Sequence, residues 1–185
     1  IDGKAPVTAT IVDGKATYLF TGLASGKHNV TVTYAGDNNF TEDSKSVNFT
    51  AESGDASLNV IVGNITYGNN ATVIVTVNPT ATGTVTVTVN GKSEILTLVD
   101  GRATLNVAGL AAGNYTVSVS YSGDGNFTGD SKTANFEVSK INPGMNVVVS
   151  NVTYGANGTV TVIVNTEATG KVNITVNGTV HEVDI

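Results

Sequence analysis

The sequence repeats itself with a period of 87 residues. The phrase YAGDNNFTEDS begins at Tyr34 and the similar phrase YSGDGNFTGDS begins at Tyr121, which is 87 residues later. Residues 57–98 and 144–185 align at the same offset without a gap and are identical at 21 of 42 positions. A fixed period of this kind indicates tandem copies of one folding unit, so it constrains the fold more than any other feature of the chain.

The period divides the chain into one whole unit and two partial units. Residues 57–143 make a complete copy, residues 1–56 correspond to the C-terminal part of an earlier copy, and residues 144–185 correspond to the N-terminal part of a later copy. We therefore expect the chain to be an excerpt from a longer array. An excerpt would not be expected to begin with Met or to carry a signal peptide or membrane anchor.

Each unit is predicted to consist of short strands. The run TVTVTV at residues 84–89 alternates Thr and Val, and period-two alternation of β-branched residues is typical of a strand with one buried face. No stretch shows helical spacing. Within the complete copy we expect strands at 58–62, 71–78, 84–90, 94–99, 102–107, 114–121 and 132–138.

Turn residues separate these strands. Asn90-Gly91 and Asp100-Gly101 lie between alternating runs, where type I′ turns need positive φ at both central residues and hairpins are favoured. Seven short strands in about 90 residues indicate an immunoglobulin-like sandwich, so the predicted fold is all-β, with tandem Ig-like modules. Strand parity predicts ten inward residues: Val73, Val75, Val77, Val85, Val87, Val89, Val117, Val119, Tyr121 and Phe136.

A tyrosine follows the tight glycine turn that opens the long strand at 114–121. Tyr115 in GLAAGNYTVSVSY is placed like the tyrosine corner of Ig-like folds, in which the hydroxyl bonds back to the main chain. His28 holds the equivalent position in GLASGKHNVTVTY. We therefore interpret His28 as a corner residue and not as a catalyst.

The phrases GLAAGNYTVSVSYSGDGNFTGDS and NITYGNNATVIVTV resemble the bacterial immunoglobulin-like repeats of adhesin-like surface proteins, particularly those of methanogenic archaea. The resemblance extends over the whole chain. It implies a secreted array of β-sandwich modules held on the cell envelope, and hence an extracellular or cell-surface location.

Composition excludes several classes of function. The formal net charge is −6, whereas nucleic acids and anionic membranes require a basic patch, so we expect no nucleic-acid partner and no membrane insertion by this segment. The chain has no Cys, and its two histidines, His28 and His181, occupy non-equivalent places in different copies. No nucleophile, base and orienting group can be assembled within one module, so we expect no enzyme activity and no cofactor.

Sequons for N-glycosylation are abundant. Eleven Asn-x-Thr sites occur, about twice as many as random placement of Asn, Ser and Thr would give. The alternative is that Asn and Thr are simply common in turns and on outer strand faces. The candidate sites are Asn29, Asn39, Asn48, Asn64, Asn70, Asn114, Asn126, Asn151, Asn157, Asn173 and Asn177.

The repeated phrase has two interpretations. Asp124 and Asp130 alternate with other oxygen-bearing side chains, as ligands do in calcium loops, and Asp37 and Asp43 repeat the spacing. The downstream bidentate Glu of such loops is absent. We favour a packed hairpin in which Asp124 accepts hydrogen bonds from its own turn and the next aromatic residue packs against the core. Calcium remains the alternative ligand.

The function predicted from these features is structural and adhesive: a rod, stalk or filament of Ig-like modules outside the cell. The alternative is a dedicated module that recognises a glycan or a partner cell through its hairpin loops. The expected partners are neighbouring copies of the same module and N-linked glycan. Because residues 144–185 and 1–56 are complementary parts of one unit, the tail of one chain could complete the head of the next, unless each finds its other half within a longer protein.

Overall fold

All 185 residues are described by the structure, a computed structural model that consists of strands, turns and loops. The chain forms two compact units, residues 1–138 and 139–185. We call residues 1–56 the head segment, residues 57–138 the central module and residues 139–185 the tail segment. The chain contains no helix long and apolar enough to cross a membrane.

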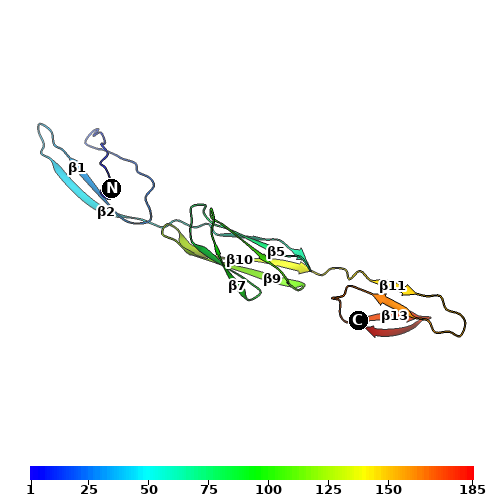
Figure 1. The fold of residues 1–185 in the computed structure, drawn as a ribbon. Helices are drawn as coiled ribbons and strands as arrows, with labels where there is room; N and C mark the ends of the chain where they lie inside the picture. The colour runs from blue at the N-terminus through cyan, green and yellow to red at the C-terminus, as the bar shows by residue number, and fades with distance from the viewer. The chain divides into compact units, whose positions relative to one another are not determined.

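The central module is a sandwich of two mainly antiparallel sheets (Figure 1). The larger sheet has the order β4-β10-β9-β6-β7, formed by Ile65–Thr66, Thr128–Ser139, Gly113–Gly123, Thr84–Val89 and Lys92–Thr97. The smaller sheet has the order β3-β5-β8, formed by Asn59–Val62, Ala71–Thr76 and Arg102–Val107. This confirms the predicted all-β, Ig-like fold class.

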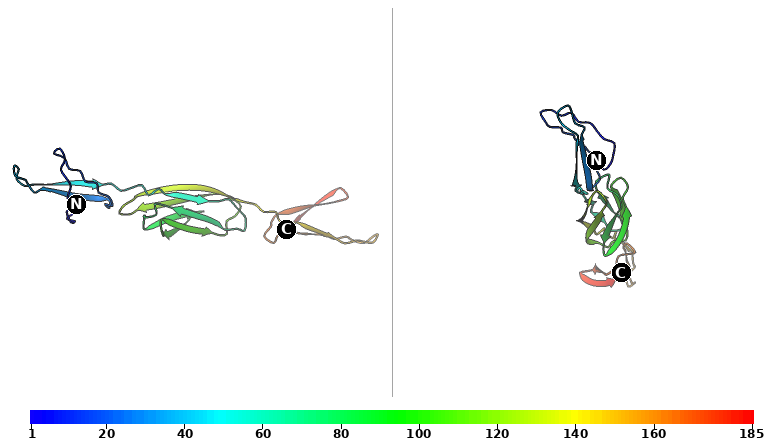
Figure 2. Two further views of the ribbon diagram at one scale, coloured as in Figure 1. Left: turned by 90° about the horizontal axis from the view of Figure 1, so that it is seen from above. Right: turned by 90° about the vertical axis from the view of Figure 1, so that its left-hand side faces the viewer.

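The core lies between the two sheets, whose layers can be followed in the two views of Figure 2. Alternate residues of β5, β6 and β9 point inward, as the period-two pattern predicts. All ten residues predicted to face inward are buried, and Val73, Val75, Val85, Val87 and Val117 are completely inaccessible to solvent. The prediction from strand parity is therefore confirmed.

The strands differ from the prediction at several boundaries, and three of the differences have a clear physical reason. β7 spans Lys92–Thr97 and not 94–99, because the type I′ turn at Asn90-Gly91 uses only two residues and pairing resumes at once. The short strand β4 was not predicted, because two residues form no periodic pattern. β10 begins at Thr128, four residues before the predicted start, because the hairpin after β9 is tight.

The head segment contains one antiparallel strand pair, β1 (Gly26–Tyr34) and β2 (Asp43–Ala51). The tail segment contains two further antiparallel pairs, β11 (Asn146–Val149) with β12 (Val160–Ile163), and β13 (Lys171–Val176) with β14 (Thr179–Asp184). β1 and β2 match β9 and β10 at the 87-residue offset, and β13 and β14 match β6 and β7.

Candidate functional site

The repeated phrase forms a hairpin between β9 and β10. The Asp124 Oδ1 atom accepts hydrogen bonds from the backbone N–H groups of Asn126 (2.8 Å) and Phe127 (2.9 Å). The Phe127 ring is half-buried and packs against the core. These are the two contacts predicted for a packed hairpin, in which an Asp side chain stabilises its own turn.

The second carboxylate oxygen of Asp124 ties the hairpin to the loop between β5 and β6. Asp124 Oδ2 accepts hydrogen bonds from the Thr82 N–H (2.8 Å) and the Thr82 hydroxyl (2.9 Å), while the Tyr121 hydroxyl donates to the Thr82 carbonyl (2.9 Å). The N–H groups of Asn126 and Thr82 hold the pKa of Asp124 well below its ordinary value, because they stabilise the charged carboxylate. Protein donors thus occupy both oxygens of Asp124.

The other calcium candidates lie in comparable local contacts. Asp130 Oδ1 accepts the Ser131 N–H, and Asp43 Oδ1 accepts the Ser44 N–H. Asp37 Oδ1 accepts the N–H groups of the two residues that follow Asn38, as Asp124 does in its own turn. Nowhere in the chain do three acidic or histidine side chains come together as potential metal ligands.

An aromatic corner is present at both copies of the Gly turn. The Tyr115 hydroxyl donates to the Ala111 carbonyl (2.9 Å), and its ring lies 5.5 Å from the Phe136 ring between centroids. At the equivalent place, His28 Nε2 contacts the Ala24 carbonyl (2.8 Å), and its ring lies 5.5 Å from the Phe49 ring. The corner role predicted for both residues is confirmed.

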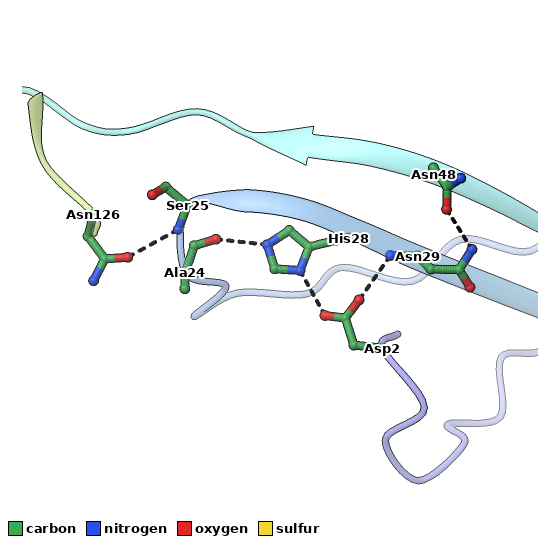
Figure 3. A network of polar contacts seen from close by, with 7 residues as sticks. All are labelled: Asp2, Ala24, Ser25, His28, Asn29, Asn48 and Asn126. Carbon is green, nitrogen blue, oxygen red and sulfur yellow. Dashed lines mark hydrogen bonds and ion pairs between the residues drawn. The ribbon is translucent and has the colours of Figure 1, made fainter. Parts of the chain in front are cut away.

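His28 makes one contact that Tyr115 does not. Its Nδ1 lies 2.7 Å from Asp2 Oδ2, and Asp2 Oδ1 accepts the N–H of Asn29 at 2.9 Å (Figure 3). Both ring nitrogens therefore face acceptors, an arrangement that only the doubly protonated imidazolium satisfies. The Asp2 carboxylate and the Ala24 carbonyl raise the pKa of His28, while the N–H of Asn29 and His28 lower the pKa of Asp2.

A joint connects the head segment with the hairpin of the central module. The Ser25 N–H donates to Asn126 Oδ1 (3.1 Å; Figure 3), and the Ser25 hydroxyl donates to the Gly125 carbonyl. The linker adds two backbone bonds, from the Gly54 N–H to the Asn126 carbonyl (2.8 Å) and from the Thr128 N–H to the Gly54 carbonyl (2.9 Å). The repeated hairpin is thus a contact surface between two successive parts of the chain.

The sequence does not reveal this joint. Ser25 and Gly54 are small residues in a turn and a linker, and such residues form no periodic pattern. The Gly54 backbone packs against the Phe127 ring. A Cβ atom added at Gly54 would lie 3.6 Å from that ring, which is an ordinary packing distance. The one usable signal is the repetition of the hairpin phrase, which indicates a role in every copy without naming its partner.

Comparison with protein families agrees with this architecture. Residues 58–139 match the family model of the bacterial Ig-like domain (group 3). The match takes in every strand of the central module, from β3 to β10, and the hairpin between β9 and β10. A comparison with curated proteins found no match.

The family match indicates a broad functional class for the central module. Domains of this family are typically structural or adhesive modules without enzyme activity, and they are commonly exposed at the cell surface. The resemblance noted in the sequence is therefore shown for the central module at the level of the domain family.

The predicted sequons occupy different environments in the structure. Ten of the eleven asparagines are exposed, and Asn29 is half-buried with its Nδ2 donating to Asn48 Oδ1 at 2.8 Å. Three exposed sequon asparagines accept a hydrogen bond on the side-chain oxygen: Asn48 from Asn29, Asn126 from the Ser25 N–H, and Asn64 from the Glu137 N–H. The nitrogen that a glycan would modify is not used in any of these three bonds.

A shallow polar hollow lies on the outer face of the larger sheet of the central module. It is lined by Thr86, Thr88, Ser118, Val119, Ser120, Ser131, Lys132 and Thr133. These side chains offer hydroxyl groups and a single cation. No aromatic ring lines the hollow, so it lacks the stacking platform on which a sugar ring packs.

Proposed function

We propose that this chain is a section of an extracellular structural stalk, built from Ig-like modules whose neighbours are held by direct contacts. The observation that carries the proposal is the joint between Ser25, Gly54 and the hairpin at residues 124–128. The match to the bacterial Ig-like domain supports the module type. The resemblance to adhesin-like proteins of archaeal envelopes supports the setting.

The joint limits the motion of the linker through hydrogen bonds to the hairpin. Gly54 is hydrogen-bonded to the hairpin on both its N–H and its carbonyl, so the linker is paired to the module that follows it. Ser25 adds two bonds from the corner turn to the same hairpin. A linker held in this way cannot act as a free swivel, which is the property that a stalk needs in order to project a distant binding site.

Nuclear magnetic resonance relaxation tests the joint. In the intact chain we expect the β1–β2 pair and the central module to share one rotational correlation time. In the double variant Asn126→Ala, Gly54→Pro, the side-chain oxygen that accepts the Ser25 N–H and the backbone N–H of Gly54 are both removed. The head segment of this variant should have a shorter correlation time. The matched control is Asn70→Ala, an exposed Asn in the same module that takes no part in the joint.

Two results would contradict the proposal. One is independent tumbling of the head segment in the unmodified chain. The other is a failure of antibodies against the central module to label intact cells of the source organism, because a stalk module must be accessible outside the cell. Binding to a glycan array that is lost when hairpin residues are changed would instead favour the alternative function, a dedicated recognition module.

We also propose that some of the sequons carry glycan in the native cell. Only 13% of the residues are charged, so attached sugars would supply solvation that the surface otherwise lacks. Mass spectrometry of native glycopeptides tests this. We expect occupancy at exposed Asn70 and low occupancy at half-buried Asn29, whose Nδ2 is engaged with Asn48. A native protein without glycan would reject the proposal.

A further inference from the structure

The head segment carries an ionisable pair where the central module has two uncharged residues. The turn at Asp2-Gly3 has φ values of 52° and 69°, close to the 49° and 73° of the turn at Asn90-Gly91, and a lysine follows each turn. His28 likewise holds the corner position of Tyr115. Asp2 and His28 therefore take the places of Asn90 and Tyr115, and the fold of the repeated unit positions both of them.

A single peptide group connects the His28 ring with the joint. The Nε2 atom contacts the Ala24 carbonyl at 2.8 Å, and the N–H of Ser25, which belongs to the same peptide group, donates to Asn126 Oδ1 at 3.1 Å (Figure 3). A peptide group is planar and rigid, so its carbonyl and its N–H move together. A chain of hydrogen bonds therefore runs from the Asp2 carboxylate through His28 to the hairpin of the central module.

Only the protonated form of His28 can donate to both of its neighbours. The imidazolium has two N–H donors, whereas the neutral ring has one donor and one acceptor. Hydrogen bonds to a charged acceptor are roughly twice as strong as neutral ones, so the remaining proton stays on Nδ1, beside the Asp2 carboxylate. The lone pair on Nε2 then faces the Ala24 carbonyl oxygen and repels the peptide group that carries the Ser25 N–H.

Asp2 and Lys4 are the charged groups that act on the His28 ring, and they act in opposite directions. The Asp2 carboxylate and then the Ala24 carbonyl raise the pKa of His28 above 6.5, while burial of the ring and Lys4 lower it by less. The ring that packs on His28 from β2, Phe49, has no charge. A backbone N–H and the His28 ring lower the pKa of Asp2, so Asp2 stays ionised. The bridge is therefore complete in acidic solution and is lost as pH rises through the raised pKa of His28.

From this geometry we infer that the protonation state of His28 controls the stiffness of the joint. When His28 is protonated, the Ala24–Ser25 peptide group is held between the ring and Asn126; when the ring is neutral, the bonds from Ser25 to the hairpin weaken and the two bonds of Gly54 remain. The inference rests on the proposed function, because it takes the joint as the element that restricts the linker. This joint is stiffer in acidic than in alkaline solution, whereas a tyrosine corner like that of Tyr115 gives no such response.

Nuclear magnetic resonance of the intact chain at a series of pH values tests the inference. We expect the rotational correlation time of the β1–β2 pair to become shorter as pH rises, with the same midpoint as the titration of the His28 ring and above 6.5. Asp2→Asn, which introduces the residue type found at Asn90, should move both midpoints toward 6.5. His28→Tyr should keep the joint and abolish its pH dependence, because a tyrosine hydroxyl holds the equivalent carbonyl in the central module.

One more variant separates an effect on the joint from an effect on the corner alone. Asn126→Ala removes the acceptor of the Ser25 N–H, so the correlation time should no longer change with pH although the His28 ring still titrates. A constant correlation time in the unmodified chain while His28 titrates, or an equal change in His28→Tyr, would overturn the inference and leave the proposed stalk intact. Independent tumbling of the head segment at every pH would reject the joint itself, and the inference with it.

Discussion

At the scale of single residues, the corner shows how two different side chains perform one structural task. Tyr115 and His28 both hold the carbonyl four residues earlier and both pack on a phenylalanine ring. Only His28 is also paired with a carboxylate, that of Asp2. We therefore expect the corner of the head segment to respond to pH, whereas a tyrosine corner should not in the neutral range.

The stability of the head segment should fall as the solution becomes alkaline. The folded pKa of His28 is raised, so its contribution is fully present below the ordinary value of 6.5 and is lost as pH rises through the higher folded value. Titration of the His28 ring by nuclear magnetic resonance measures this. Asp2→Asn should return the pKa toward 6.5, and His28→Tyr should keep the corner without the pH dependence; an unchanged titration in Asp2→Asn would refute the pairing.

Val87 gives a second prediction at this scale. Its side chain is completely buried between the sheets, with no cation near it in the core cluster. Val87→Asp should lower the free energy of unfolding by about 3–5 kcal/mol, because an uncompensated charge would be buried. Urea unfolding followed by circular dichroism checks this. The control is Thr84→Asp, at an exposed position on the same strand, and it should change the free energy of unfolding little.

At the scale of elements, the hairpin turns follow local chemistry closely. Asn90-Gly91 and Asp100-Gly101 both have positive φ at both positions, as type I′ turns require. The two turns differ in their surroundings. A Cβ on Gly91 would meet nothing within 4 Å, whereas one on Gly101 would lie 2.5 Å from the Asn78 carbonyl oxygen.

This difference yields a matched pair of variants. Gly91→Ala should cost about 1–2 kcal/mol of unfolding free energy, which is the backbone strain of an L-residue at φ +73°. Gly101→Ala has nearly the same φ, +68°, and adds a clash with the backbone of the β5–β6 loop, so it should be clearly the more destabilising. Equal thermal unfolding midpoints for the two variants would show that the close approach is unimportant.

At the scale of the whole molecule, burial is unevenly distributed. Every residue of the buried apolar core lies between Ala56 and Val138. The head segment and the tail segment hold their strands in two-stranded pairs, which are marginal without a covering layer. The three parts should therefore differ widely in local stability.

Hydrogen exchange followed by mass spectrometry measures that difference. In dilute solution the amides of β6 and β9 should exchange slowest, and those of β1 and β13 much faster. Protection that is uniform along the chain in dilute solution would contradict the observed distribution of the core.

The sequence by itself determined the all-β fold class, the ten inward residues of the central module and the type I′ turns, and it favoured a packed hairpin at Asp124 over a calcium loop. These features depend on neighbours within a few residues, such as alternation along a strand, an Asn-Gly pair, or a carboxylate beside its own turn. The 87-residue repeat alone also identified Tyr115 and His28 as equivalent positions.

Only the tertiary structure decided which distant groups meet. Ser25 and Asn126 are 101 residues apart, and Asp2 and His28 are 26 apart, so neither contact leaves a periodic trace in the sequence. The structure likewise decided that Asp124 binds Thr82, 42 residues away, and that Tyr34 turns to Asp37 where an equivalent Thr is lacking. Such contacts depend on how the sheets and segments pack, and packing brings together residues that no local pattern connects.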